Sequence, residues 1–168
     1  MTRFAELAGA LGIDLTSDEI VAAEAAWHEA EEAFKATLAE KEGITAVFVA
    51  PSAEMLYVAN PERAGDVLYA RELGLSIPDV TVDPANGDYW EYVSPEQINT
   101  FTTDIFYSSS RGISIEETIA IPTVAALPAV QAEQIYVWDQ DYIASYQGLT
   151  KFLTHLAETV GQSEIVTA

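Results

Sequence analysis

The sequence switches repeatedly between the period of a helix and that of a strand, and this alternation limits the fold more than any other feature. Residues 44–50 (ITAVFVA) form a β-branched run typical of a strand buried on both faces. Further strands are predicted over residues 55–59, 78–82, 104–107 and 134–138, and helices over residues 62–73 and from near residues 94, 114 and 143. This alternation predicts a three-layer, Rossmann-like α/β fold with a mostly parallel central sheet.

A long helix is predicted to precede the sheet. Residues 16–19 (TSDE) have the form of a capping box, with Thr16 as the N-cap, and Gly43 is predicted to stop the helix. Between them, apolar residues recur at intervals of three and four: Ile20, Ala23, Trp27, Ala30, Phe34 and Leu38. We expect this stripe to lie on the core.

The composition excludes several classes of protein. With 168 residues and 49% hydrophobic content, the chain is long enough to bury the core of one domain. Its formal charge of -20 opposes binding to nucleic acid and to anionic lipid. The sequence has no cysteine and no apolar run long enough to span a bilayer, and we do not expect residues 1–14 to be a secretory signal because they are too polar and are interrupted by glycine. If the natural protein is exported, we expect its targeting segment to lie outside this chain.

The motifs of common enzymes are not present. The sequence contains neither GxGxxG nor GxxxxGK, the glycine patterns that wrap a backbone around phosphates. Gly112, Ser114 and Glu116 begin like a nucleophile elbow, but the second glycine is missing and no histidine is obviously placed as a base. We assign no catalytic residue.

The two histidines are poor candidates for metal ligands. His28 shares a helical face with Glu24 and Glu32, which we interpret as a solvated acidic face because a second histidine ligand is missing. His155, on the last predicted helix, receives the same interpretation. We predict no metal site and no cofactor.

Aromatic residues follow or precede several predicted strands. In an open parallel sheet, ligands contact the loops at the carboxyl ends of the strands, here residues 83–90, 108–112 and 139–142. Tyr89, Trp90 and Tyr142 fall in these loops and are typical of a binding surface, the alternative being that they cap the sheet edge. Arg111, in the second loop, is predicted either to neutralise an anionic ligand or to pair with a carboxylate.

A second candidate surface follows Trp90 directly. Ser94, Pro95 and Glu96 are predicted as the N-cap, the first residue and an acidic first-turn residue of a helix. A glutamate at an exposed helix start offers a protruding charge to an arginine of a partner, the alternative being that it only caps its own helix.

Three segments together resemble a known family. They are residues 57–75 (YVANPERAGDVLYARELGL), 89–107 (YWEYVSPEQINTFTTDIFY) and 127–142 (LPAVQAEQIYVWDQDY). Their order is similar to that in the carboxyl-terminal lobe of the periplasmic substrate-binding proteins of ABC transporters for iron siderophores, haem or cobalamin. The resemblance implies that residues 1–15 are the tail of an interdomain helix with its connection. It also implies that residues 16–168 form one lobe and that the amino-terminal lobe is absent from this chain.

The resemblance also implies roles for individual residues. Glu96 would dock on arginines of the ABC permease, and Trp90 and Tyr142 would contact the ligand. Our full expected ligand-binding set is Trp90, Tyr89, Tyr142, Arg111, Ser109 and Tyr107. A lobe alone offers half a site, so we expect its own affinity to be weak.

The function implied is that of a monomeric, non-enzymatic substrate-binding component of an ABC importer. It would act outside the cytoplasmic membrane, in the periplasm or lipid-anchored to the outer face of that membrane. The scarcity of cations favours an Fe(III)-siderophore of the hydroxamate type, with haem and cobalamin as open alternatives. The alternative from another class is a small α/β enzyme or a chelatase-like metal- or cofactor-binding domain.

Overall fold

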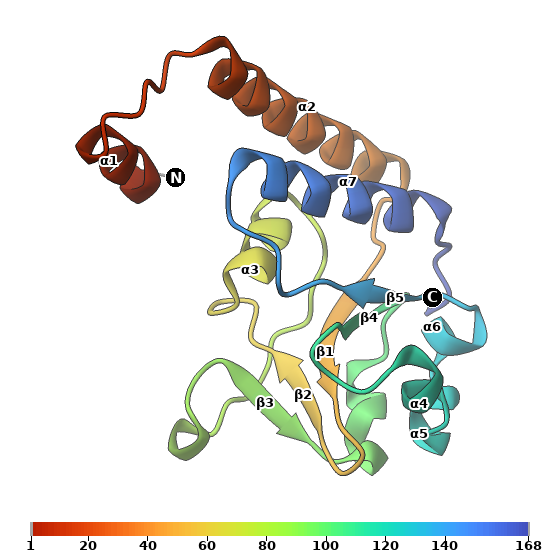
Figure 1. Ribbon diagram of the computed structural model, residues 1–168. Helices are drawn as coiled ribbons and strands as arrows, with labels where there is room; N and C mark the ends of the chain where they lie inside the picture. Colours follow the sequence, from red (N-terminus) through yellow and green to blue (C-terminus); the bar gives the residue numbers. More distant parts are fainter. Residues whose placement is uncertain (1, 168) are drawn as a thin grey trace.

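The chain forms one five-stranded sheet between two layers of helices (Figure 1). The computed structural model describes residues 2–167. The strands lie in the order β3-β2-β1-β4-β5, with bounds β1 Ala46–Pro51, β2 Leu56–Ala59, β3 Trp90–Val93, β4 Ile105–Ser109 and β5 Ile135–Trp138. Only β2 runs against the others, since β1 pairs in parallel with β4, β4 with β5, and β2 is antiparallel to both of its neighbours. The predicted α/β fold with a mostly parallel sheet is confirmed.

Each face of the sheet has its own core. On one face, α2 (Asp18–Glu40), α3 (Gly65–Glu72) and α7 (Tyr146–Gln162) cover a cluster that includes Phe34, Phe48 and Leu153, which we call the α7-side core. On the other face, the 3-10 helix η2 (Pro95–Phe101) and the short helices α5 (Pro122–Ala125) and α6 (Pro128–Gln131) cover the α5-side core. The strands alternate between the two, so that Val47 and Val49 face the second core and Phe48 the first.

The later part of the apolar stripe of α2 lies on the α7-side core, as predicted, whereas Ile20 and Ala23 line a cavity beside α1. Ala30 and Phe34 are buried, and Trp27 and Leu38 pack against the same cluster. The predicted capping box was wrong, because Ser17 is the N-cap residue and the Thr16 hydroxyl instead donates a hydrogen bond to Asp14 (2.6 Å). The helix ends at Glu40, three residues before Gly43.

One predicted strand was wrong and one observed strand was missed. Residues 78–82 do not form a strand, although the Thr81 N–H donates to the Glu91 carboxylate of β3. β3 occupies the stretch that the sequence placed in a loop, and its aromatic residues were interpreted as loop residues. In both cases pairing partners decided the outcome, since a strand exists only where a neighbouring strand accepts its hydrogen bonds.

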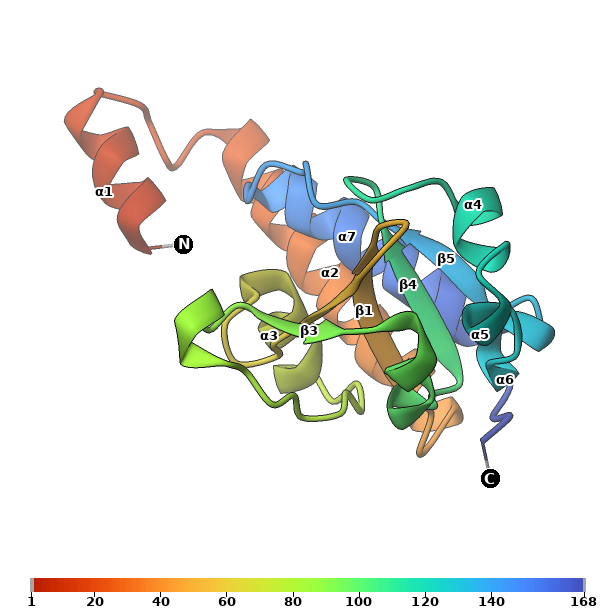
Figure 2. The same cartoon turned by 90° about the horizontal axis from the view of Figure 1, so that it is seen from below.

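The remaining helices are short, apart from α1 (Thr2–Ala10), which stands away from the body of the molecule (Figure 1 and Figure 2). Two more short helices lie in the connections between strands: the 3-10 helix η1 (Pro84–Asn86) precedes β3 in the chain, and α4 (Ile115–Ile119) follows β4. A cavity of about 610 Å³ lies between α1 and the starts of α2 and α7. None of the helices over residues 2–167 is both long enough and apolar enough to cross a membrane.

The buried carboxylate of Asp104 joins three parts of the chain at the end of the sheet where β1 and β4 begin. Asp104, just before β4, is fully buried and accepts hydrogen bonds from the Thr45 N–H (2.8 Å) and hydroxyl (2.7 Å). Its other oxygen accepts from the Val166 N–H (2.8 Å), the Thr167 N–H (2.9 Å) and the Thr167 hydroxyl (2.8 Å). The carboxylate therefore ties the carboxyl-terminal segment to the starts of β1 and β4.

Candidate functional site

Aromatic rings from both halves of the sheet meet on the α7-side face. Trp90 opens β3, and its half-buried ring lies 4.7 Å from that of Tyr89 and 6.1 Å from that of Trp138, centroid to centroid. Trp138 is the last residue of β5 and is buried. Although Trp90 and Trp138 belong to different halves of the sheet, the edge-on packing of their rings makes them one wall.

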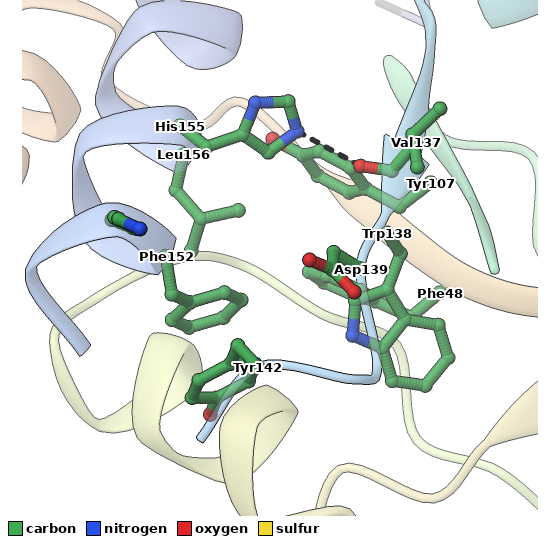
Figure 3. Close-up of a pocket in the computed structure, with 10 residues that line it drawn as sticks. Phe48, Tyr107, Val137, Trp138, Asp139, Tyr142, Phe152, His155 and Leu156 are labelled. Carbon is green, nitrogen blue, oxygen red and sulfur yellow. Dashed lines mark hydrogen bonds between the residues drawn. The ribbon is translucent and has the colours of Figure 1, made fainter. Parts of the chain in front are cut away.

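A cavity of about 290 Å³ continues from this wall between β5 and α7 (Figure 3). The loop after β5 closes it, with the ring of Tyr142 stacked on that of Phe152 at 5.4 Å. The cavity is lined by aromatic and aliphatic side chains together with an aspartate, a lysine and a histidine: Phe48, Tyr107, Val137, Trp138, Asp139, Tyr142, Lys151, Phe152, His155 and Leu156. Its volume is at the lower limit of cavities that enclose a small organic ligand, about 300–1,000 Å³.

One carboxylate organises the polar side of the site. Asp66, in the first turn of α3, accepts a hydrogen bond from the Trp138 indole N–H (2.7 Å) and so sets the orientation of that ring. Burial first, and then the nearby charge of Asp66, raise the pKa of Tyr142 and of Tyr89 above the ordinary phenol value. Both phenols therefore stay protonated and can donate hydrogen bonds to a ligand.

Arg111 is already paired within the lobe. Its guanidinium donates to Asp141 Oδ1 from two nitrogens, at 2.9 and 2.6 Å, and to the Gln140 carbonyl at 3.3 Å. The side chain remains 60% exposed. Two roles were predicted for Arg111, pairing with a carboxylate or neutralising an anionic ligand, and the structure shows the pairing with Asp141. An anionic ligand would therefore have to compete with Asp141 for the guanidinium.

Two of the expected ligand-binding residues lie deeper than the others. Ser109, at the end of β4, is buried, and its hydroxyl donates to the Gln140 side chain and accepts from the Arg111 N–H (3.1 Å). Tyr107 is fully buried, stacks on Phe48 at 4.6 Å and is hydrogen-bonded to Thr159 (2.6 Å). Ser109 therefore supports the loops from behind, whereas the ring of Tyr107 is part of the cavity wall.

Glu96 lies apart from the rings. It is exposed in the first turn of η2, which follows β3, and forms no salt bridge or hydrogen bond with another described residue. Ser94 is the N-cap, as predicted, but its hydroxyl contacts Gln97 Oε1 (3.3 Å) and caps no backbone N–H. Glu96 therefore presents a free carboxylate on the surface.

The motifs set aside in the sequence have structural roles. The Ser114 hydroxyl accepts from the Glu117 N–H in a complete capping box at the start of α4. The His28 ring contacts the Glu31 carboxylate (2.8 Å), and His155 Nε2 is 2.8 Å from the Val137 carbonyl oxygen (Figure 3). Across residues 2–167, no group of three or more potential metal ligands comes together.

Sequence reasoning missed Trp138 and Asp66. Trp138 is the residue at the carboxyl end of a correctly predicted strand, so the rule that ligands gather at strand ends would have found it. Asp66 gave no such signal, because only the tertiary structure brings the start of α3 to the end of β5.

Gly148 controls how closely the Tyr142 loop approaches α7. A Cβ at this position would overlap the Ile143 carbonyl oxygen and lie 3.3 Å from the Tyr142 ring. We expect Gly148→Ala to displace the loop at a cost of about 1–3 kcal/mol in stability. Gly161→Ala in the same helix is the matched control, because its Cβ would meet only Thr37 Cγ2 at 3.6 Å. Thermal denaturation of both variants tests this, and equal melting temperatures would contradict it.

Comparisons with known proteins agree with this architecture. DesE, a ferric-siderophore receptor protein from Streptomyces coelicolor, is 28% identical, with a TM-score of 0.87 over 98% of this chain and 56% of its own. A component of a Fep/Fec-like ferrichrome ABC transporter from Bacillus subtilis is 18% identical (TM-score 0.70, 95% of this chain, 62% of that one). PiaA from Streptococcus pneumoniae, solved in complex with ferrichrome, is 16% identical (0.63, 94% and 57%).

The chain thus spans a little over half the length of these relatives, and a carboxyl-terminal lobe fits. The comparison with curated proteins gave no match. Residues 2–142 match the family described as periplasmic binding protein, which covers most of the sequence and agrees with the resemblance of the three segments. The chain belongs to the periplasmic binding protein family.

Proposed function

We propose that this chain is one lobe of the substrate-binding component of an ABC importer and that it binds a ferric siderophore against a second lobe. The observation that carries the proposal is the wall of rings formed by Tyr89, Trp90 and Tyr142 on one face of the lobe, with the buried ring of Trp138 packed against Trp90. An iron chelate whose metal is already coordinated by the siderophore needs no protein ligand, and large rings pack well against its organic shell. Family membership supports the transport role.

The size of the cavity supports a site shared between two lobes. At about 290 Å³, the space beside Trp138 and Tyr142 is too small to enclose a whole siderophore complex. The chelate would instead rest on the rings and be covered from the other side. The proposed interdomain position of residues 1–15 agrees with the exposed apolar side chains of that region, among them Leu11 (68% exposed) and Ile13 (48%).

The charges around the rings favour a hydroxamate chelate. Three carboxylates, Asp66, Asp139 and Asp141, lie at the site, and Arg111 is already paired with the last of them. Three hydroxamates neutralise Fe(III), whereas three catecholates leave a complex with a net charge of about -3, which these carboxylates would repel. Delivery to the permease would use the free carboxylate of Glu96, and the protein would act outside the cytoplasmic membrane.

Trp90→Ala tests the ligand site. In the two-lobed protein, we expect this change to weaken binding of a ferric hydroxamate at least about tenfold, because a central aromatic anchor is lost. Isothermal titration calorimetry measures the affinity without relying on the removed fluorophore. Trp27→Phe is the control. Trp27 belongs to α2, and its indole N–H donates a hydrogen bond to the hydroxyl of Tyr69 on α3 (2.7 Å). Wild-type affinity in Trp90→Ala would remove Trp90 from the site.

A further inference from the structure

Two tyrosines on the outer strands continue the wall of rings. Tyr57 of β2 and Tyr92 of β3 are directly paired in the sheet, and their rings lie 5.1 Å apart. Tyr57 in turn lies 6.4 Å from Trp90, which contacts Trp138 at 6.1 Å. Neither tyrosine belongs to the residues that the sequence or the resemblance assigned to ligand binding.

The strand register places both tyrosines on the face and at the level of the proposed site. Their neighbours Val58 and Val93 point into the α5-side core, so the tyrosines point to the opposite face. Tyr57 also pairs with Ala50 of β1. Val49 of β1 pairs with Ser108 of β4, so the next residues, Ala50 and Ser109, lie side by side. Ser109 in turn pairs with Trp138 of β5. The row Tyr92, Tyr57, Ala50, Ser109 and Trp138 therefore crosses the whole sheet just below the carboxyl ends of β1, β4 and β5.

The surface of this row is open at its β3 end. In Figure 1, β2 and β3 lie at the side of the sheet farthest from α2 and α7, and α3 is the helix of that layer nearest to them. Tyr92 is 42% exposed and Tyr57 is half-buried. Neither phenol hydroxyl forms a hydrogen bond with any of the described residues, so both can donate to an external carbonyl oxygen.

We propose that Tyr57 and Tyr92 extend the ligand site along the sheet and bind the organic periphery of the chelate, an inference that rests on the proposed function. The surface formed by the two tyrosines adjoins Trp90. Its rings can pack against the methylene linkers of a siderophore, and its hydroxyls can donate hydrogen bonds to the amide carbonyls of that siderophore. Because Tyr57 and Tyr92 do not line the cavity, they would contact the outer part of a large siderophore, whereas a compact complex seated on Trp90 and Tyr142 would make fewer contacts with them. The two tyrosines therefore select for the size of the siderophore.

The test compares two ferric hydroxamates with the same iron coordination, using the two-lobed protein. One is a linear trihydroxamate with methylene linkers, and the other is ferric tris(acetohydroxamate), measured in excess acetohydroxamate. We expect Tyr92→Leu to weaken binding of the first about tenfold and of the second less than about twofold. Trp90→Ala should weaken both. Tyr92→Phe separates the hydroxyl from the ring, and Ile119→Ala, an exposed apolar change on α4, is the control.

The outcomes separate the two proposals. If the wild-type protein binds a ferric hydroxamate and Tyr92→Leu binds both complexes like wild type, the extended site is wrong while the proposed function stands. If the wild-type protein binds neither complex, the proposed function itself fails. A lower melting temperature of Tyr92→Leu with unchanged affinities would show that the tyrosines contact another part of the protein, which also overturns the inference.

Discussion

Asp104→Ala is expected to lower the free energy of unfolding by about 3 kcal/mol or more, which corresponds to a fall in melting temperature of about 6–12 °C for a domain of this size. The carboxylate accepts five hydrogen bonds, and its removal leaves the backbone N–H groups of Thr45, Val166 and Thr167 without their acceptor. Because Asp104 is fully buried, water does not replace it without a rearrangement.

The control for Asp104 is an exposed carboxylate. Asp79 pairs with Arg71 at 2.8 Å, but its side chain is 81% exposed. We expect Asp79→Ala to change stability by less than about 1 kcal/mol, as is usual for surface ion pairs. Urea denaturation of the two variants and the wild type measures the difference. A wild-type midpoint for Asp104→Ala would show that the carboxyl-terminal segment is held by other contacts.

The same carboxylate gives the stability a pH dependence. Burial alone would raise the pKa of Asp104, but the hydrogen bonds from Thr45, Thr167 and Val166 outweigh it, and the pKa is lowered below its ordinary value of 3.8. The stabilisation is therefore complete above the unfolded pKa and is lost as the pH falls through the folded pKa. In acid titrations we expect Asp104→Asn to lose less stability than wild type, starting from a lower value at neutral pH.

Glu96→Lys is expected to cut uptake at least about tenfold while leaving the affinity for the chelate unchanged, because it replaces the carboxylate of the proposed docking contact by a repelling charge. Glu96 is exposed and its side chain forms no hydrogen bond or salt bridge with another described residue, so we expect the fold to tolerate the change. Uptake of a radiolabelled ferric hydroxamate by cells carrying the permease gives the transport rate, and calorimetry gives the affinity.

Glu116→Lys is the matched control for Glu96. Glu116 is also an exposed first-turn glutamate, on α4, and its reversal changes the net charge by the same amount. Normal uptake with Glu96→Lys, or an equal loss with both variants, would reject a specific role for Glu96 in docking.

Several elements could be predicted because their signals are local. The β-branched run of β1 and the apolar stripe of α2 show their burial directly in the order of residues. The strand β3 was not predicted, because its aromatic residues were interpreted as loop residues and the strand exists through its pairing with β2. Likewise, Thr16 and Ser17 are both good capping residues, and the chain's path before α2 decided between them.

The sequence by itself determined the α/β class, the family and the exposed position of Glu96, because these depend on periodicity, on residue order and on a local helix start. Only the tertiary structure decided which rings share a wall. The fold brings Trp90 beside Tyr57 and Trp138, and Trp138 beside Asp66, although the two members of each pair are far apart in the chain. It also decided that Arg111 is paired with Asp141, since a guanidinium binds whichever carboxylate the folded loops place beside it.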